Sequence, residues 1–302
     1  MLRGLYTAAA GMITQQRRHD AITNNVANLN TPGYKEQQAV IRSFPEMLVR
    51  LAGSDVPGMP PGFGSPAIGK INSGVMVEEL VPNFTPGTLL ETGNPYEFAL
   101  ISNIRVFEEI GGELVEIAFD ASGIGVNAAG ETVYRPEAFF TVWNEAGEAR
   151  YTRNGSFYLD AEGGLRTSDG HRVIGADGQP IVLDVPLNEV RMAPNGALFD
   201  ARTGEPLPGA PALMIARIDN PFNLVREGAG VFRLADPDAN PPAAADPAEF
   251  AVRQGFLEQS NVDAAQAMVD MMTALRIYEA NQRVIQYYDR SLEKAVNEIG
   301  RV

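Results

Sequence analysis

A stripe of residues near the N-terminus recurs at the spacing of a helix that packs against a partner. Steps of three and four residues separate its positions, which are Leu2, Leu5, Ala9, Met12, Gln16, His19, Thr23 and Val26. This is the a/d register of a heptad repeat, apolar in its first half and polar in its second. Ile22 widens the stripe, and Thr31-Pro32-Gly33 ends the pattern after a run of asparagines. We therefore predict an N-terminal helix that ends before Thr31.

A second stripe of large side chains runs through the C-terminal segment. Its members follow in steps of three, four or seven residues and are Met268, Met272, Leu275, Tyr278, Ile285, Tyr288, Leu292 and Ile299. The period is close to 3.5, which is typical of a seam for a partner helix. Ser260 and Asp263 resemble a capping box, and Gly300 stands where a helix C-cap belongs. The pattern predicts a helix about 60 Å long, at 1.5 Å per residue.

The middle of the chain changes to the alternation and turn signals of β-strands. Asn154-Gly155 stands between two short runs, 149–153 and 156–159, and predicts a hairpin. Further turn pairs are Gly111-Gly112, Gly163-Gly164, Asp169-Gly170, Asp177-Gly178 and Asn195-Gly196. This spacing predicts a β-rich domain, either a sandwich or an irregular barrel.

Together the patterns predict an α+β fold, in which paired N- and C-terminal coiled-coil-forming helices accompany a central β-rich domain. The N-terminal helix and a following extended segment take residues 1–52, and a Pro/Gly-rich loop takes 53–75. The central β-rich domain takes residues 76–248, and the C-terminal helix takes 249–302.

Composition and charge narrow the classes of function. The 302 residues carry 24 basic and 38 acidic side chains, a net charge of −14. Residues 53–248 alone are net −15, whereas residues 1–52 are net +3 and residues 249–302 net −2. An acidic body argues against binding nucleic acid, which needs Lys and Arg to neutralise phosphates. No apolar run approaches the roughly 18 residues of a membrane span, so we expect no membrane insertion.

The chemistry-bearing residues are few. There is no cysteine, and the two histidines are His19 and His171. This excludes disulfides, thiolate catalysis, cysteine-ligated zinc and a His-rich metal site. His171 has no recognisable Ser or Cys nucleophile beside it. Acidic residues that are adjacent in sequence could in principle cleave glycosides, but among 38 carboxylates adjacency alone does not identify a catalytic pair. The N-terminal residues lack the long apolar block of a Sec-type signal peptide.

Three motifs resemble ligand-binding sequences but differ from them at the residues that would bind the ligand. Residues 64–70 have the spacing of a phosphate-binding loop, but Ile71 stands where Ser or Thr coordinates magnesium. Residues 123–128 resemble a dinucleotide fingerprint, but turn residues follow in place of a helix. Asp236, Asp238 and Asn240 resemble the start of a calcium loop whose later positions are prolines. We therefore expect no enzyme activity, no cofactor and no metal.

Residues at both ends resemble a known family. Residues 21–35, Ala-Ile-Thr-Asn-Asn-Val-Ala-Asn-Leu-Asn-Thr-Pro-Gly-Tyr-Lys, resemble the N-terminal signature of the bacterial flagellar rod and hook proteins. Residues 257–263, Leu-Glu-Gln-Ser-Asn-Val-Asp, with Met268, Tyr278 and Asn281 beyond them, resemble the C-terminal signature. Segments 92–100, 151–157 and 216–221 are similar to internal motifs, in the family's order. The length is nearer to rod members, the distal one first and a proximal one next, than to the larger hook subunit.

The resemblance implies a structural axial subunit of the flagellar basal-body rod. Family members polymerise helically through their terminal helices into a hollow shaft that transmits torque for motility. Their partners are copies of themselves, other rod and hook proteins, and the flagellar type III export apparatus, which exports them without a cleaved signal peptide. The expected location is the basal body, outside the cytoplasmic membrane. The assembly interface would comprise Leu2, Leu5, Ala9, Met12, Ile22, Asn24, Asn25, Val26, Asn28, Met268, Met272, Leu275, Tyr278, Ile285, Tyr288 and Leu292.

Two alternatives stay open at this point. One is a non-flagellar filament or cell-surface adhesin subunit built on the same helix pairing. The other is a carbohydrate-active enzyme that remodels the cell wall.

One segment departs from the family pattern. In the family, Gly-Asn-Pro and Phe-Ala-Leu are soon followed by Gly-Asp-Gly-Phe-Phe, whereas here residues 101–137 intervene and the Gly-Asp-Gly element is missing. Gly111-Gly112 separates two apolar alternating runs within this insert. The pattern predicts that the insert is an exposed extra hairpin on the β-rich domain.

Overall fold

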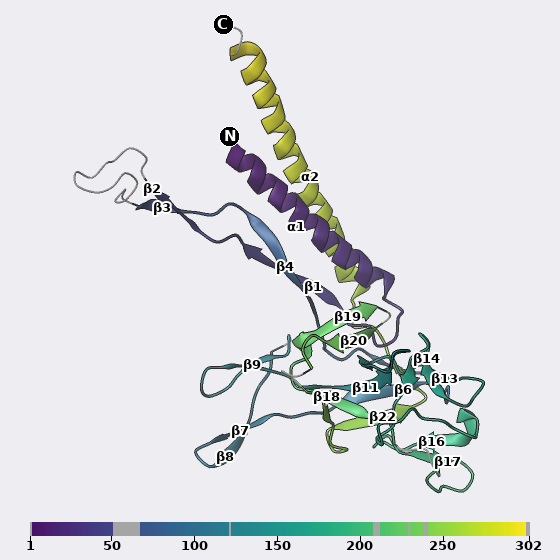
Figure 1. The fold of residues 1–302 in the computed structure, drawn as a ribbon. Helices are drawn as coiled ribbons and strands as arrows, with labels where there is room; N and C mark the ends of the chain where they lie inside the picture. The colour runs from purple at the N-terminus through teal and green to yellow at the C-terminus, as the bar shows by residue number, and fades with distance from the viewer. Residues whose placement is uncertain are drawn as a thin grey trace. The chain divides into compact units, whose positions relative to one another are not determined.

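The computed structural model describes residues 2–50, 67–120, 122–207, 212–228, 230–237 and 241–299. A helix stands at each end of the chain and strands lie between them (Figure 1), which confirms the predicted α+β class with its strand-rich centre. The chain divides into two compact units, each built from segments distant in sequence. Unit 1 comprises residues 1–26, 37–81 and 264–302, and unit 2 comprises residues 27–36 and 82–263.

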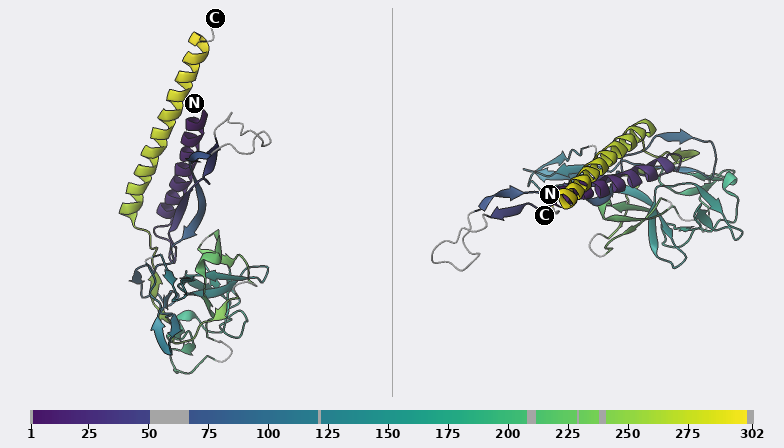
Figure 2. Two further views of the ribbon diagram at one scale, coloured as in Figure 1. Left: turned by 90° about the vertical axis from the view of Figure 1, so that its left-hand side faces the viewer. Right: turned by 90° about the horizontal axis from the view of Figure 1, so that it is seen from above.

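Unit 1 consists of the two terminal helices and an arm of strands. Helices α1 (Leu2–Ala27) and α2 (Ala264–Lys294) lie side by side in the different views (Figures 1 and 2), and α2 continues into a short π-helical segment, η3 (Ala295–Ile299). The arm contains β1 (Gln37–Ser43), β2 (Met47–Arg50), β3 (Ala67–Ile71) and β4 (Val75–Pro82). Strand β1 pairs with β4, and β2 pairs antiparallel with β3. Most of the predicted Pro/Gly-rich loop, residues 53–66, lies outside the described residues, and its last part contains β3.

Unit 2 is built from short strands, as the turn signals indicate. In chain order they are β5 (Leu89–Glu91), β6 (Phe98–Ser102), β7 (Phe107–Ile110), β8 (Glu113–Glu116), β9 (Ile124–Val126), β10 (Thr132–Tyr134), β11 (Glu137–Trp143), β12 (Ala149–Thr152), β13 (Phe157–Leu159), β14 (Leu165–Thr167), β15 (Arg172–Val173), β16 (Val190–Met192), β17 (Leu198–Asp200), β18 (Ile215–Ile218), β19 (Leu224–Gly228), β20 (Val231–Leu234), β21 (Ala243–Ala244), β22 (Phe250–Gln254) and β23 (Phe256–Glu258). Two 3-10 turns, η1 (Leu187–Glu189) and η2 (Pro221–Asn223), precede β16 and β19.

The largest sheet of unit 2 has nine strands. Its main path runs β13-β14-β15-β11-β12-β20-β19, with β18 also beside β11 and β21 beside β18. Separate antiparallel pairs join β6 to β22 and β5 to β23. These two pairs bring the segment before α2 against strands from the first third of the chain, so the C-terminal signature is anchored in this unit.

Strand β11 is the centre of the packing in unit 2, because its two faces belong to two hydrophobic clusters. Phe140 packs with Phe98 and Phe157 on one face, while Phe139 packs with Phe84 and Phe232 on the other. Successive side chains of a strand point to opposite faces, so a strand between two cores is apolar almost throughout. All of β11 except Trp143 is buried.

Most of the predicted turns are confirmed. Gly111 and Gly112 both have positive φ, 65° and 91°, and connect β7 to β8. The Asn154-Gly155 hairpin is wrong, because β12 pairs with β11 and β20 while β13 pairs with β14. The physical reason is a close approach of backbones: the Phe98 N–H donates to the Gly155 carbonyl at 3.0 Å, and a Cβ on Gly155 would overlap the Phe98 carbonyl oxygen.

The insert at residues 101–137 contains two hairpins where the pattern predicted one. Strand β7 pairs with β8, and β9 pairs with β10. The second turn lies at Gly130, whose φ is +82°. In β7 and β8 every side chain is exposed except that of Glu108, which is half-buried. The first hairpin therefore presents its side chains to the surface of unit 2.

Candidate assembly site and its buried ion cluster

The terminal helices of unit 1 contact each other through small and polar residues. Gly4 and Gly11 on α1 leave room for α2, since a Cβ on Gly4 would overlap the Tyr288 hydroxyl and one on Gly11 would lie 2.8 Å from the Asn281 Nδ2. Arg18 Nη2 lies 3.2 Å from the Asp270 Oδ1. These pairs run in opposite directions along the two helices, so the helices are antiparallel.

These contacts have heptad spacing, and apart from Tyr288 they lie on residues that the predicted stripes do not contain. On α1 the contact positions Gly4, Gly11 and Arg18 are seven residues apart. On α2, Asn281 and Tyr288 continue the seven-residue spacing of Ala267 and Ala274, the helix's two buried residues. Glycine and alanine permit close helix approach but carry little hydrophobic signal. A search for small residues at heptad spacing would have found Gly4, Gly11, Ala267 and Ala274.

The predicted interface residues are distributed over several faces. On α1, Ile22 and Asn25 are buried, and Asn24 is exposed. Half-buried positions among the predicted residues are Leu5, Ala9, Met12, Val26, Asn28, Tyr278, Ile285, Tyr288 and Leu292, while the side chain of Leu2 lies outside the described residues. On α2, Met268, Met272 and Leu275 are exposed by 56%, 52% and 44%.

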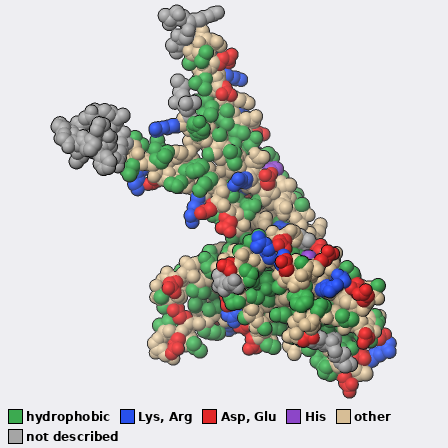
Figure 3. All heavy atoms as spheres, viewed as in Figure 1, with side chains coloured by type: hydrophobic (Ala, Val, Ile, Leu, Met, Phe, Trp, Pro, Cys, Tyr) green, Lys and Arg blue, Asp and Glu red, His purple; other side chains and the backbone are tan. Residues whose placement is uncertain are grey.

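Unit 1 therefore presents large apolar side chains on its surface. Tyr6 and Ile13 on α1 are 68% and 58% exposed, and Met47 on β2 is 57% exposed. Figure 3 shows hydrophobic side chains gathered over α1 and the neighbouring strands of the arm. Contiguous exposed apolar surface of this kind marks interaction sites in soluble proteins.

Two asparagines of the signatures hold backbone segments with both ends of the amide. In unit 1, Asn25 Nδ2 donates to the Gln37 carbonyl and its Oδ1 accepts from the Gln37 N–H, both at 2.9 Å. In unit 2, Asn261 Oδ1 accepts from the Glu36 N–H at 2.7 Å, and its Nδ2 donates to the Asn83 carbonyl at 2.9 Å. An amide side chain offers a donor and an acceptor together, as a peptide group does. Each asparagine therefore fixes the backbone segments that it bridges within its own unit.

Unit 2 contains a buried ion cluster that joins both terminal signatures to an internal motif. Glu258 is its centre: Oε1 lies 2.7 Å from the Lys35 Nζ, and Oε2 lies 3.0 Å from the Arg153 Nε. Glu137 Oε2 lies 3.9 Å from the Arg153 Nη1. The side chains of all four residues are at most 5% exposed. Glu137 Oε1 also lies 3.1 Å from the Nε of Arg135, which is 27% exposed, so two buried cations and one partly exposed cation face two carboxylates.

Backbone groups complete the cluster. Lys35 Nζ donates to the Thr85 carbonyl at 2.9 Å, and Arg153 Nη1 donates to the Ala138 carbonyl at 2.6 Å. The Gly87 N–H donates to the Glu258 Oε1 at 3.0 Å. A buried charge is costly unless it is both paired and hydrogen-bonded, and this arrangement meets both conditions for Glu258.

The environment shifts the pKa of the central residues. Burial alone would raise the pKa of the Glu258 carboxyl, but the charges of Arg153 and Lys35 outweigh it and lower that pKa to about 2. Burial lowers the pKa of the Lys35 ammonium below its ordinary value, and Glu258 offsets only part of this because Arg153 stands nearby. Glu258 therefore stays ionised in the folded chain at neutral pH, between two cations.

The N-terminal signature loop lies directly on this cluster. Gly33 has φ +68°, its N–H donates to the Glu258 carbonyl at 2.8 Å, and a Cβ there would lie 2.5 Å from the Arg153 carbonyl carbon. Tyr34 is 1% exposed, and the Arg226 guanidinium lies 4.3 Å from the centre of its ring. The loop is thus held by its backbone, its ring and its lysine, and the cluster is a structural clasp with no open face for a substrate.

Within the described residues, no group of three or more His, Cys, Asp or Glu side chains is placed to hold a metal ion. In the same part of the chain, no helix combines the length and apolarity that crossing a membrane requires.

Three family models match separate parts of the chain. "Flagella basal body rod protein" matches residues 5–35, "Flagellar hook protein FlgE/F/G D1 domain" matches residues 136–199, and "Flagellar basal body rod FlgEFG protein C-terminal" matches residues 253–298. The first and third contain the signatures that supply Lys35 and Glu258, and the second contains Glu137 and Arg153. The ion cluster therefore draws a residue from each matched segment.

Whole-length relatives are similar to the chain as well. The "Flagellar hook-basal body complex protein FlhO" of Bacillus subtilis (strain 168) is 36% identical over 303 residues, which cover 100% of both chains. The "Flagellar basal-body rod protein FlgG" of Agrobacterium fabrum is 29% identical over 295 residues, 95% of this chain and 96% of the relative. The "Flagellar basal-body rod protein FlgF" of Mesorhizobium japonicum is 26% identical over 301 residues, 99% of each.

Proposed function

The chain belongs to the family of flagellar basal-body rod proteins, and on this premise we infer that it is a structural subunit of the flagellar rod. We propose that it polymerises helically through α1 and α2 into a hollow shaft that transmits torque for motility. Its partners would be copies of itself, other rod and hook proteins, and the flagellar type III export apparatus. Its place would be the basal body, outside the cytoplasmic membrane, and its role would involve no catalysis.

One observation carries the polymerisation: α1 contacts α2 at glycines, while several large apolar side chains of both helices are exposed. Gly4 and Gly11 face α2, whereas Tyr6 and Ile13 are exposed on the same helix. Fully burying an exposed Leu or Met side chain stabilises by about 1.5–3 kcal/mol. Contacts between neighbouring subunits would gain this burial, which the contact inside one subunit does not supply.

The ion cluster supports the proposal that unit 2 folds on its own core while unit 1 provides the assembly surfaces. Unit 2 carries its own hydrophobic clusters and the clasp around Glu258. We propose that this clasp fixes, within unit 2, the signature loops that are continuous in sequence with the two terminal helices.

The test is assembly of the purified protein. We expect concentrated protein to form tubes in negative-stain electron microscopy and to sediment as a polymer. Leu5→Asp and Leu275→Asp should abolish the tubes, because a carboxylate would be buried at each contact. Thr273→Asp is the matched control for the second, since it introduces the same charge at an exposed position on α2 that lies outside the apolar stripe. Wild-type protein that stays monomeric at every concentration and salt condition would contradict the polymerisation.

A further inference from the structure

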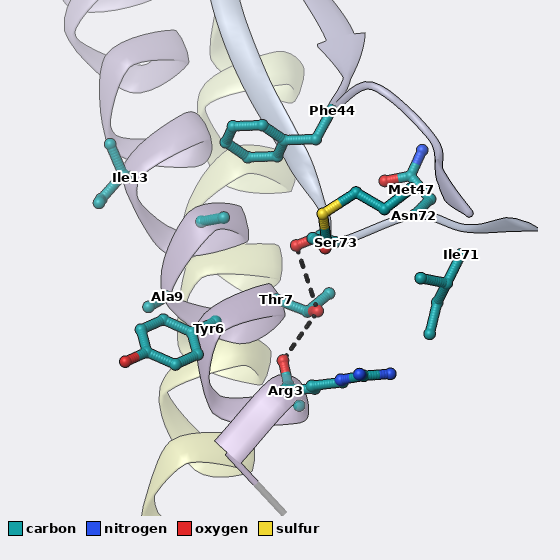
Figure 4. Close-up of a pocket in the computed structure, with 12 residues that line it drawn as sticks. Arg3, Tyr6, Thr7, Ala9, Ile13, Phe44, Met47, Ile71, Asn72 and Ser73 are labelled. Carbon is teal, nitrogen blue, oxygen red and sulfur yellow. Dashed lines mark hydrogen bonds between the residues drawn. The ribbon is translucent and has the colours of Figure 1, made fainter. Parts of the chain in front are cut away.

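An apolar cavity of about 660 Å³, which we call the groove, lies between α1 and the strand arm of unit 1. Figure 4 shows its walls: Tyr6 and Ile13 belong to α1, whereas Phe44, Met47 and Ile71 come from the arm. Arg3 supplies the one charged side chain among the described residues that line it. Thr7, Asn72 and Ser73 add polar groups to a lining that is otherwise apolar. A cavity of this size and composition has the chemistry of a site for several hydrophobic side chains.

Two threonine hydroxyls of α1 lie between a carbonyl of their own helix and a carbonyl of the arm. Thr7 Oγ1 donates to the Arg3 carbonyl at 3.0 Å and lies 3.4 Å from the Ser73 carbonyl (Figure 4). Seven residues further on, Thr14 Oγ1 donates to the Ala10 carbonyl at 2.8 Å and lies 3.1 Å from the Val75 carbonyl. These contacts place the arm along the length of α1 that lines the groove.

We propose that this groove receives the α2 ridge of a second copy of the chain, the ridge being Met268, Met272 and Leu275. This inference rests on the proposed function and names the contact that would build the polymer. Methionine side chains are flexible and polarisable, which suits them to fill an irregular apolar cavity. Within one subunit the ridge is exposed and α2 contacts α1 through Gly4 and Gly11, so the chain's own ridge does not fill its own groove.

Charge gives the direction of the pairing, and the lengths of the ridge and the groove agree with it. The ridge positions continue to Glu279, which follows Leu275 by one helical turn. Glu279 is 60% exposed and lies 3.9 Å from the exposed Arg283 of its own helix, so its carboxylate is accessible to a second cation. The distance from residue 268 to residue 279 along a helix is about 16 Å, and that from residue 3 to residue 13 is about 15 Å. The ridge of the second copy therefore fits the length of the groove. In this arrangement Glu279 of the second copy contacts Arg3 of the first, and Met268 of the second copy lies near Ile13 of the first.

The geometry also explains why such a contact would propagate. The groove and the ridge are different surfaces of one unit, so their pairing is head-to-tail. A head-to-tail contact that does not close into a ring leads to an open helical filament. The same surface pair, repeated, would extend the polymer without any other partner.

The first experiment uses the absence of cysteine from the chain. One preparation carries Ile13→Cys and another carries Met272→Cys, and the two are mixed and treated with a short bismaleimide. We expect an intermolecular link in the mixture and none between chains of one preparation. The matched control replaces Met272→Cys by Tyr287→Cys, a position 65% exposed on another face of α2, and should give at least tenfold less product.

The second experiment exchanges the charges. Arg3→Glu and Glu279→Arg should each raise the concentration at which polymer forms by threefold or more, and the two changes together should restore it. Polymer that forms without the Ile13–Met272 link and without charge rescue would overturn this pairing and leave the proposed function standing. A second outcome is that the chains form only dimers, which show both the Ile13–Met272 link and the charge rescue. This outcome would support the pairing and overturn helical polymerisation. Neither link nor polymer would overturn both.

Discussion

Glu258→Gln is the substitution that tests the ion cluster most directly. The change keeps the size of the side chain and removes its charge. Lys35 and Arg153 would then remain buried within hydrogen-bonding distance of a neutral amide, and Glu137 would be the one carboxylate left near them, 3.9 Å from Arg153. Removing one partner of a buried ion pair leaves an uncompensated buried charge, and the loss is typically about 3–5 kcal/mol.

The pKa of Glu258 gives a second route to the magnitude. A shift from 4.5 to about 2 is worth about 3 kcal/mol, at roughly 1.4 kcal/mol per unit. Because the pKa is lower in the folded chain than in the unfolded one, this stabilisation is complete above about 4.5 and is lost as pH falls from there towards 2. At low pH the protonated wild type resembles the variant, so the difference in the free energy of unfolding between them should shrink over this window.

The assay is denaturant unfolding followed by tryptophan fluorescence. The chain contains one tryptophan, Trp143, which lies in β11 and therefore reports on unit 2. The control is Glu116→Gln, the same chemical change at an exposed carboxylate 3.9 Å from the exposed Arg105, where the expected loss is below about 1 kcal/mol. Equal losses for the two variants at neutral pH, or a difference that does not change between pH 5 and pH 2, would refute the reasoning.

Three further predictions follow from glycines that lie close to other parts of the chain and from the exposed β7–β8 hairpin. Gly33→Ala should destabilise unit 2 by more than about 1 kcal/mol beyond Gly93→Ala in the same fluorescence assay, because both glycines have nearly the same φ, 68° and 67°, but a Cβ meets backbone only at Gly33. Gly11→Leu should separate α1 from α2 and reduce assembly measured by sedimentation, whereas Gly69→Ala, with nothing within 4 Å of its Cβ, should assemble normally. Replacing residues 107–116 by Gly-Gly should change the free energy of unfolding by less than about 1 kcal/mol, because the Ile117 N–H already meets the Val106 carbonyl at 2.9 Å; a larger loss would show that the β7–β8 hairpin supports the core.

Local patterns predicted the elements that depend on local physics. The two helices, the end of α1 before Thr31-Pro32-Gly33 and the Gly111-Gly112 turn follow from period, proline and positive φ. Asn154-Gly155 shows the limit of this reasoning, because its glycine serves an approach to Phe98 from another part of the chain. A turn signal and a close-packing signal use the same residue, and the sequence alone does not distinguish them.

The candidate site could be predicted as a set of motifs but not as a cluster. The family resemblance pointed to the segments that contain Lys35, Arg153 and Glu258. Each of these residues looks like an ordinary surface charge in sequence, and more than 100 positions separate each from the next. Their burial arises when the end of β12, strand β23 and the loop after α1 meet, and no local stretch of sequence contains all three. The positions of the helix contact were missed for a different reason, since Gly4, Gly11 and Ala274 contribute little to a hydrophobic pattern.

The contrast between the two units decides how substitutions should act. Unit 2 buries Phe139, Phe140 and the ions around Glu258 within itself, so changes there alter the free energy of unfolding at any protein concentration. The two buried residues of α2 are Ala267 and Ala274, while Met268, Met272 and Leu275 are exposed. Changes in this ridge remove little that a single subunit buries, so they should leave Trp143 fluorescence unfolding unchanged. Their cost should appear instead in the concentration at which polymer forms, because the stabilisation that they remove exists only between subunits.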